Sequence, residues 1–103
     1  MAKVETSLWD AAEFIETPED VALYLEAAFD EAADANDPGL IAHALGVVAR
    51  SKGMAKIAEA TGRSREQLYR SLSAEGNPTL ATIMEVLRSL GVRLKVAPLE
   101  PAK

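Results

Sequence analysis

Apolar residues recur three and four positions apart over most of the chain, and each run is preceded by polar residues able to cap a helix. Thr17 and Pro18 open the first clear run, and Asp37 and Pro38 open the second. Each pair supplies an N-cap side chain followed by a proline at the first helical position. Gly53 is expected to end the second helix. The expected core faces are Val21, Leu25, Ala28, Phe29 and Ala32 on the first helix and Ile41, Ala44, Leu45 and Val48 on the second.

Further helical elements are predicted before the first of these helices and near the C-terminus. Residues 1–7 show no periodicity, and a short helical turn is expected over residues 8–15. A last helix is expected after the sequence Asn-Pro-Thr at 77–79, with Gly91 as its stop. The apolar side chains expected to face the core are Leu8, Trp9, Ala12 and Ile15 in the turn, and Leu80, Ile83, Leu87 and Leu90 in the last helix.

The hydrophobic period changes from helical to alternating after Gly91. This alternation predicts a short strand. A lone strand is not stable, so its partner is expected to come from a second copy of the chain or from another protein. The final residues, 97–103, are rich in proline and are expected to be disordered. In the predicted strand Val92, Leu94 and Val96 alternate with Arg93 and Lys95.

Residues 54–72 predict two short helices joined by a tight turn. Gly62 is the residue best able to adopt the left-handed conformation that ends a helix. Ser64 can cap the next helix, and Gln67 stands where it completes a capping box. Helical spacing then directs Met54, Ile57, Ala58, Leu68 and Leu72 to the core, and Arg65, Glu66, Gln67, Tyr69 and Arg70 to the surface.

The spacing of Ala58, Gly62, Ser64 and Leu68 resembles the helix-turn-helix of the Cro/cI-like phage repressors. There the small residue lets two helices approach, the glycine makes the bend, and the cap and the leucine position a recognition helix for the major groove of DNA. Plain corners of helical bundles also contain glycine turns, so that interpretation stays open. The resemblance implies an all-α, five-helix Cro/cI-like bundle, to which the hydrophobic pattern adds an extra N-terminal helix and the short C-terminal β-strand.

Charge divides the chain into two unequal halves. The net charge of −5 argues against nucleic acid when taken alone, but residues 1–45 hold one base and eleven acids, whereas the remainder holds ten bases and five acids. The chain is 103 residues long, and we therefore expect a single domain. It is expected to comprise an acidic helical extension over residues 8–36, a DNA-binding helix-turn-helix core over 37–91, and the strand and flexible tail over 92–103.

Other compositional features limit the classes of function. The chain has no cysteine and no apolar run long enough to cross a bilayer, which indicates a cytoplasmic protein that does not act at a membrane. His43 is the single histidine, so a metal site is not expected. No pairing of a nucleophile with a base is evident, and we therefore expect neither a cofactor nor an enzyme.

The motifs GM at 53–54, SREQLYRSL at 64–72 and GNPT at 76–79 resemble the addiction-module antidote family over residues 9–96. Members of that family are similar to HigA-type antitoxins. The resemblance implies an antitoxin of a type II toxin–antitoxin system that binds and neutralises a small basic toxin of the RelE/ParE/HigB class. It also implies a homodimer that binds operator DNA and represses its own operon.

Carried onto this sequence, the base-reading positions of the Cro/cI-like superfamily fall on Arg65, Glu66 and Arg70, with Gln67 and Tyr69 as second choices. Two alternatives stay open. Glu66 and Arg70 are spaced to form a surface ion pair worth about 0.3 to 0.5 kcal/mol, and Gln67 can serve as a cap alone. The residues expected to contact DNA phosphates are Lys52, Lys56, Arg63 and Ser64.

The acidic positions of the first long helix support a second hypothesis. Such a face is typical of a solvated surface, and it would also suit a basic protein partner. The chain could then be a protein-interaction module with a vestigial helix-turn-helix, which binds a basic partner through the acidic helix and residues 92–96. A solitary phage-type repressor without a toxin also fits the sequence. The acidic positions are Glu26, Asp30, Glu31 and Asp34.

Overall fold

The computed structural model describes residues 15–73 and 75–99. Five helices and no strand lie in this part of the chain, as the predicted all-α class requires. The turn expected over residues 8–15 falls outside it, except for Ile15, which is buried in the core. The helices are α2 (Pro18–Ala35), α3 (Pro38–Lys52), α4 (Met54–Thr61), α5 (Arg65–Ser71) and α6 (Leu80–Ser89).

The predicted helix starts are confirmed by their caps. The Thr17 hydroxyl accepts the Asp20 N–H at 3.1 Å, and the Asp20 carboxylate accepts the Thr17 N–H at 3.1 Å, which completes a capping box. Backbone N–H groups of Glu16 and Thr17 donate to this carboxylate and hold the pKa of Asp20 below its ordinary value. At the start of α3, the Asp37 carboxylate accepts the Gly39 N–H at 3.0 Å.

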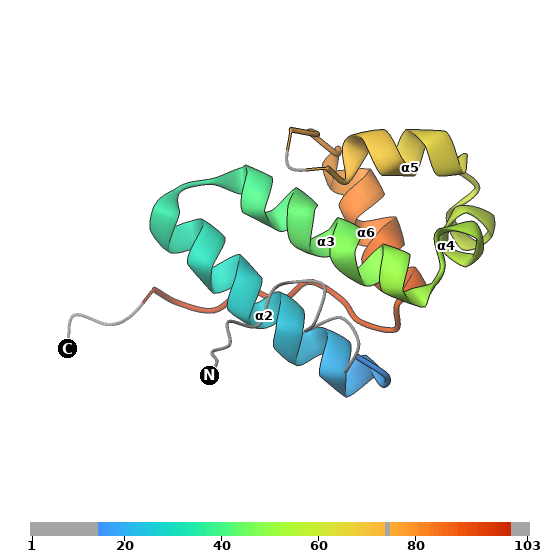
Figure 1. The fold of residues 1–103 in the computed structure, drawn as a ribbon. Helices are drawn as coiled ribbons and strands as arrows, with labels where there is room; N and C mark the ends of the chain where they lie inside the picture. The colour runs from blue at the N-terminus through green and yellow to red at the C-terminus, as the bar shows by residue number, and fades with distance from the viewer. Residues whose placement is uncertain (1–14, 74, 100–103) are drawn as a thin grey trace, which may run out of the picture.

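Helix α3 lies in the middle of the bundle, with α2 on one side of it and α5 on the other (Figure 1). Residues 44–49 of α3 are all buried, although the sequence pattern predicts a single apolar stripe. Most of these residues are small, so neighbouring helices can approach α3 closely from several directions. At Gly46 an added Cβ would collide with the carbonyl oxygen of Leu72 at the end of α5.

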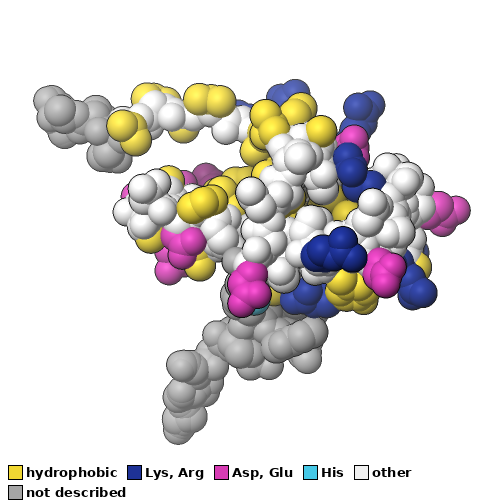
Figure 2. Space-filling view, turned by 90° about the horizontal axis from the view of Figure 1, so that it is seen from above, with side chains coloured by type: hydrophobic (Ala, Val, Ile, Leu, Met, Phe, Trp, Pro, Cys, Tyr) yellow, Lys and Arg dark blue, Asp and Glu magenta, His cyan; other side chains and the backbone are white. Residues whose placement is uncertain are grey.

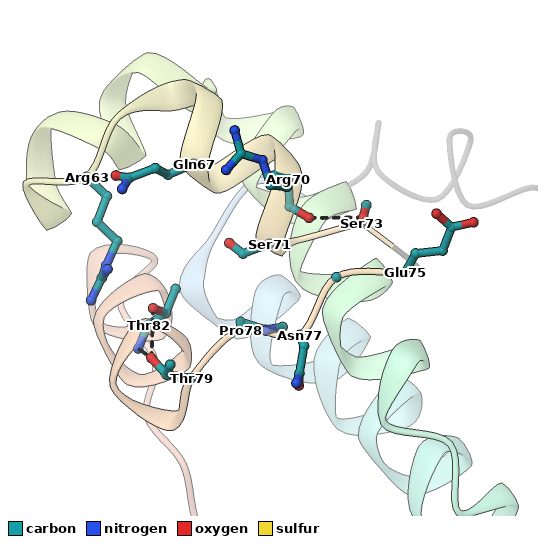
Figure 3. Close-up of a pocket in the computed structure, with 11 residues that line it drawn as sticks. Arg63, Gln67, Arg70, Ser71, Ser73, Glu75, Asn77, Pro78, Thr79 and Thr82 are labelled. Carbon is teal, nitrogen blue, oxygen red and sulfur yellow. Dashed lines mark hydrogen bonds between the residues drawn. The ribbon is translucent and has the colours of Figure 1, made fainter.

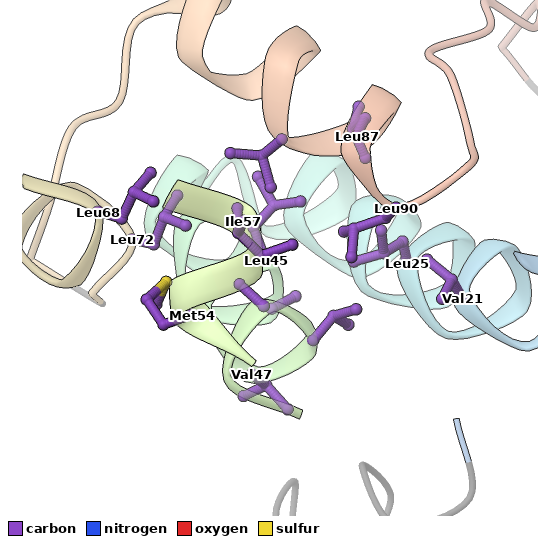
Figure 4. Close-up of a cluster of buried hydrophobic side chains, with 14 of the residues drawn as sticks. Val21, Leu25, Leu45, Val47, Met54, Ile57, Leu68, Leu72, Leu87 and Leu90 are labelled. Carbon is purple, nitrogen blue, oxygen red and sulfur yellow. The ribbon is translucent and has the colours of Figure 1, made fainter. Parts of the chain in front are cut away.

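One hydrophobic cluster joins all five helices (Figure 4). Leu25 of α2, Leu45 of α3 and Ile57 of α4 are buried in it, as the sequence predicts. The side chains that are fully buried are Leu45, Leu68, Leu72, Val21, Val48 and Val86.

The prediction for Leu80 is wrong. This side chain was expected in the core face of the last helix, but it is 63% exposed, whereas Val86 and Leu87 are buried. Leu80 is the first residue of α6, and side chains on a helix lean toward its N-terminus. The Leu80 side chain therefore points out past the edge of the bundle.

The strand predicted over residues 92–96 is not formed in the single chain, since the described residues contain no strand. The Val92 N–H donates to the Leu87 carbonyl at 3.0 Å, and within the described residues no further backbone hydrogen bond is made by 93–99. Val92 packs on the core, and the four residues that follow it are exposed, with Val96 96% exposed. A strand needs a neighbouring strand to pair with, and the described part of the chain offers none. The exposed residues are Arg93, Leu94, Lys95 and Val96.

The close approach at Gly46 makes a prediction about stability. Gly46→Ala should lower the free energy of unfolding, because overpacking costs about 1 to 3 kcal/mol. Alanine gains only about 1 kcal/mol over glycine in a helix, so the loss should prevail. Thermal unfolding followed by circular dichroism measures the effect. Gly62→Asn is the control, since an added Cβ there meets nothing and asparagine tolerates the left-handed conformation. An unchanged melting temperature for Gly46→Ala would show that α3 and α5 are not closely packed.

Candidate nucleic-acid interface

The turn between α4 and α5 has the predicted geometry. Gly62 is left-handed (φ 76°), and its N–H donates to the Ala58 carbonyl at 2.9 Å. The Ser64 hydroxyl accepts the Gln67 N–H at 3.0 Å, and the Gln67 side-chain oxygen accepts the Ser64 N–H at 3.1 Å. These bonds confirm the capping box and fix the start of α5.

Thr61 is a further residue of the turn that the sequence patterns missed. Its hydroxyl donates to the Ile57 carbonyl at 2.8 Å and accepts the Arg63 N–H at 3.3 Å. Threonine often bonds back to the preceding helical turn, so its place four residues after Ile57 is a signal that could have been used. Thr61 therefore ties the end of α4 to the backbone of the turn.

Helix α5 is held by two fully buried leucines, Leu68 and Leu72. All five of its predicted outward side chains are exposed, so the predicted surface face is confirmed. Figure 2 looks down on the side of the molecule that carries α5, and Lys and Arg side chains project there with single acidic side chains between them. The outward side chains are Arg65, Glu66, Gln67, Tyr69 and Arg70.

The sequence leaves two alternatives for these side chains, an ion pair between Glu66 and Arg70 and a capping role for Gln67. The structure supports the second. Within the described residues, Arg70 forms no ion pair with Glu66, so both side chains are open to a ligand. Gln67 does serve as a cap, and its carbonyl oxygen is occupied by the Ser64 N–H. The side-chain amide of Gln67 still reaches the groove described next.

A polar groove of about 540 Å³ separates α5 from the start of α6. One side of the groove is lined by Arg63, Gln67 and Arg70, and the other side by Thr79 and Thr82 (Figure 3). The Arg63 Nε atom donates to Glu85 of α6 at 2.8 Å, which links the turn to α6. At this groove the structure brings together two of the predicted base-reading residues, Gln67 and Arg70, and one predicted phosphate ligand, Arg63. The other three, Arg65, Glu66 and Tyr69, are exposed on α5 outside the groove.

The two predicted lysine ligands lie elsewhere. The Lys52 Nζ atom donates to the Glu16 carbonyl at 3.0 Å, so this lysine holds the chain just before α2. Lys56 is exposed and lines, with Lys52 and Pro18, a separate cleft beside the end of α6. The predicted set of phosphate ligands is therefore divided between two places, and Arg63 and Ser64 are the members that lie next to α5.

A second surface of strong charge lies on α2. This helix carries six acids and no base, and the four acids predicted to face outward are all exposed. Beside them runs a groove of about 410 Å³ between α2 and the C-terminal segment, with apolar side chains on its walls. The side of the groove formed by α2 includes Glu26 and Asp30. The side formed by the C-terminal segment includes Arg93 and Lys95. The apolar lining consists of Ala22, Leu25, Phe29, Leu87, Val92, Leu94, Val96 and Ala97.

Comparison with known proteins gives a family for this fold. Residues 5–98 match the family described as "Probable addiction module antidote protein". The chain belongs to that family. An uncharacterized protein of Haemophilus influenzae is 41% identical over 88 residues, which span 85% of this chain and 87% of the relative. No solved structure matches the chain.

Membership of the antidote family implies a toxin as partner, since an antidote acts on a toxin, and it points to a regulatory protein. Among residues 15–73 and 75–99 of this antidote protein, no group of three or more side chains is placed to hold a metal ion. None of the described helices is both long and apolar enough to cross a membrane.

Proposed function

We propose that this antidote protein is the antitoxin of a type II toxin–antitoxin system and the DNA-binding repressor of its own operon. The observation that carries the DNA-binding half is the outward face of α5, where Arg65, Glu66 and Arg70 are exposed and unpaired within the described residues. The capping box and the two buried leucines fix the helix that presents them. A rigid helix that projects polar side chains is what the major groove of DNA accepts.

In this proposal α4 and α5 act as a helix-turn-helix. Arg65 and Arg70 would each donate two hydrogen bonds to guanine O6 and N7, and Glu66 would accept one from cytosine N4. Arg63 is oriented by Glu85 through Nε and would use its terminal nitrogens on a DNA phosphate. Ser64 and Lys56 are the remaining phosphate ligands of the proposal, and Tyr69 and Gln67 its secondary contacts.

We place the toxin on the opposite side of the molecule, at α2 and its groove. The acids of α2 would attract a basic toxin of the RelE/ParE/HigB class and would repel DNA. The groove adds apolar contact area, and residues 93–99 have backbone groups without hydrogen bonds to any described residue. An extended segment of the toxin could pair with residues 92–96 and give them the neighbouring strand that the single chain lacks.

The arginines of α5 provide the test of DNA binding. Arg65→Ala and Arg70→Ala should each weaken binding to the DNA upstream of the protein's own gene by about 1 to 3 kcal/mol and relax its base preference. Lys56→Ala should weaken upstream and scrambled DNA alike, because a phosphate contact does not depend on sequence. Fluorescence anisotropy with labelled fragments measures both effects. Arg93→Ala, which removes an exposed arginine far along the chain from α5, should change neither. Unchanged affinity in both α5 variants would refute the proposed base contacts.

The acidic side chains that α2 contributes to the groove provide the test of the toxin site. The double variant Glu26→Lys and Asp30→Lys should weaken binding of the adjoining gene's product at least about tenfold, the effect expected when 1.4 kcal/mol or more of attraction is lost. Isothermal titration calorimetry with the purified product measures this affinity. The double variant Glu59→Lys and Glu75→Lys makes the same change in charge at exposed acids outside α2 and should keep toxin binding. Equal losses in both double variants would mean that net charge, and not the α2 face, determines affinity.

The second candidate function is a protein-interaction module whose α5 face no longer reads DNA. The groove beside α2 is the observation that favours it, since this groove combines apolar walls with charged rims as protein-binding sites do. This candidate predicts partner binding that survives removal of Arg65 and Arg70, together with the absence of salt-dependent DNA binding.

A further inference from the structure

The capping box at the start of α5 fixes how the side-chain amide of Gln67 is turned. The Gln67 oxygen accepts the Ser64 N–H at 3.1 Å, and the Ser64 hydroxyl accepts the Gln67 N–H at 3.0 Å. An amide nitrogen carries only donors, so it cannot replace the oxygen opposite the Ser64 N–H. The oxygen is therefore directed at the backbone of the turn, and the Nε2 group is the end of the amide that is left for a ligand.

The Nε2 group of Gln67 forms no hydrogen bond with any described residue. Gln67 is exposed, and it lies on the α5 side of the polar groove together with Arg63 (Figure 3). The next residue, Leu68, is fully buried and prevents α5 from rotating about its axis. Gln67 thus presents the two N–H donors of its amide on a helix whose orientation is fixed.

The base edges in the major groove differ in what such an amide can bind. Guanine presents the acceptors O6 and N7, and thymine presents the acceptor O4. Adenine and cytosine instead present amino groups, at N6 and N4, and a donor that meets a donor leaves both without a partner. A glutamine that reads adenine needs its oxygen and its nitrogen together. In Gln67 that oxygen already accepts the Ser64 N–H.

The other polar side chains of α5 cannot make this adenine contact in place of Gln67. The helix contains no asparagine, and Gln67 is the single glutamine of the chain. Arg65 and Arg70 carry only donors, and Glu66 in its ionised form carries only acceptors. The α5 face therefore has no free side chain that can bind N6 and N7 of adenine together.

We infer that the capping box makes Gln67 select a keto base, guanine or thymine, at one position of the DNA site that α5 binds. The inference rests on the proposed DNA binding by α5. It makes Gln67 a determinant of base specificity through the same bond that makes it a cap. It does not require the DNA site to lie upstream of the protein's own gene.

The test measures base preference with a random-sequence DNA library. Fragments bound by the purified full-length protein are sequenced, and fluorescence anisotropy compares the selected fragment with its single-base variants. Wild type should prefer guanine or thymine at one position by about fivefold or more. Gln67→Glu keeps an oxygen for the Ser64 N–H but replaces Nε2 with an acceptor, so the preference at that position should change to cytosine or adenine. Its melting temperature should not fall, because the capping box is retained.

The matched control is Asn77→Asp. It makes the same change from amide to carboxylate at an exposed residue that lines the groove outside α5. The added negative charge should weaken binding of all fragments alike and leave the preferred bases unchanged. The control therefore separates an effect of charge from an effect on base specificity.

The outcomes separate this inference from the proposed function. If Gln67→Glu selects the same bases as wild type, or if Asn77→Asp shows the same change of preference, the inference is overturned while DNA binding stands. A wild type that enriches no fragment overturns both the inference and the repressor proposal. A change from a keto to an amino base in Gln67→Glu alone supports the inference, even if the selected site is absent from the upstream DNA and self-repression fails.

Discussion

The close packing of α2, α4 and α5 on α3 is the constraint on which this fold depends. Six consecutive residues of α3 are buried, which is possible because five of them are alanine, glycine or valine and let neighbouring backbones approach. At Gly46 the end of α5 comes so near that no side chain fits between the helices. Leu68 and Leu72 pack into the same core, so the contact with α3 fixes the orientation of α5. The exposed face of α5 is thus held rigidly, as a site that must match another rigid surface requires.

Two faces of different character follow from this arrangement. The face of α5 is polar and carries two arginines, and the face of α2 is acidic and borders an apolar groove. Since α2 and α5 lie on opposite sides of α3, ligands of opposite charge would not compete for space (Figure 1). The net charge of −5 reflects mainly the N-terminal half and does not describe the surface around α5. We propose that the α2 face binds a toxin and that the α5 face binds operator DNA.

Local signals in the sequence predict most of the fold and fewer of the contacts. Thr17, Asp37, Gly62 and Ser64 act within a few residues of themselves, and the helix ends that they predict are confirmed. Contacts between distant segments leave no such pattern. Lys52 binds the Glu16 carbonyl, 36 positions away, and Arg63 binds Glu85, 22 positions away, so neither role could be predicted from spacing. Leu80 has helical spacing but lies at the edge of the bundle, and residues 92–96 alternate as a strand does but have no described neighbour to pair with.

Binding of the purified wild-type protein to DNA tests the central claim most directly. A labelled fragment from upstream of its own gene is compared with a scrambled fragment at about 50 mM and about 200 mM salt. We predict preferential binding of the upstream fragment, and an affinity that falls as salt rises because counterions are released from the phosphates that the protein contacts. Equal binding of the two fragments, or no binding with or without the adjoining gene's product, would contradict the claim that the α5 face reads DNA.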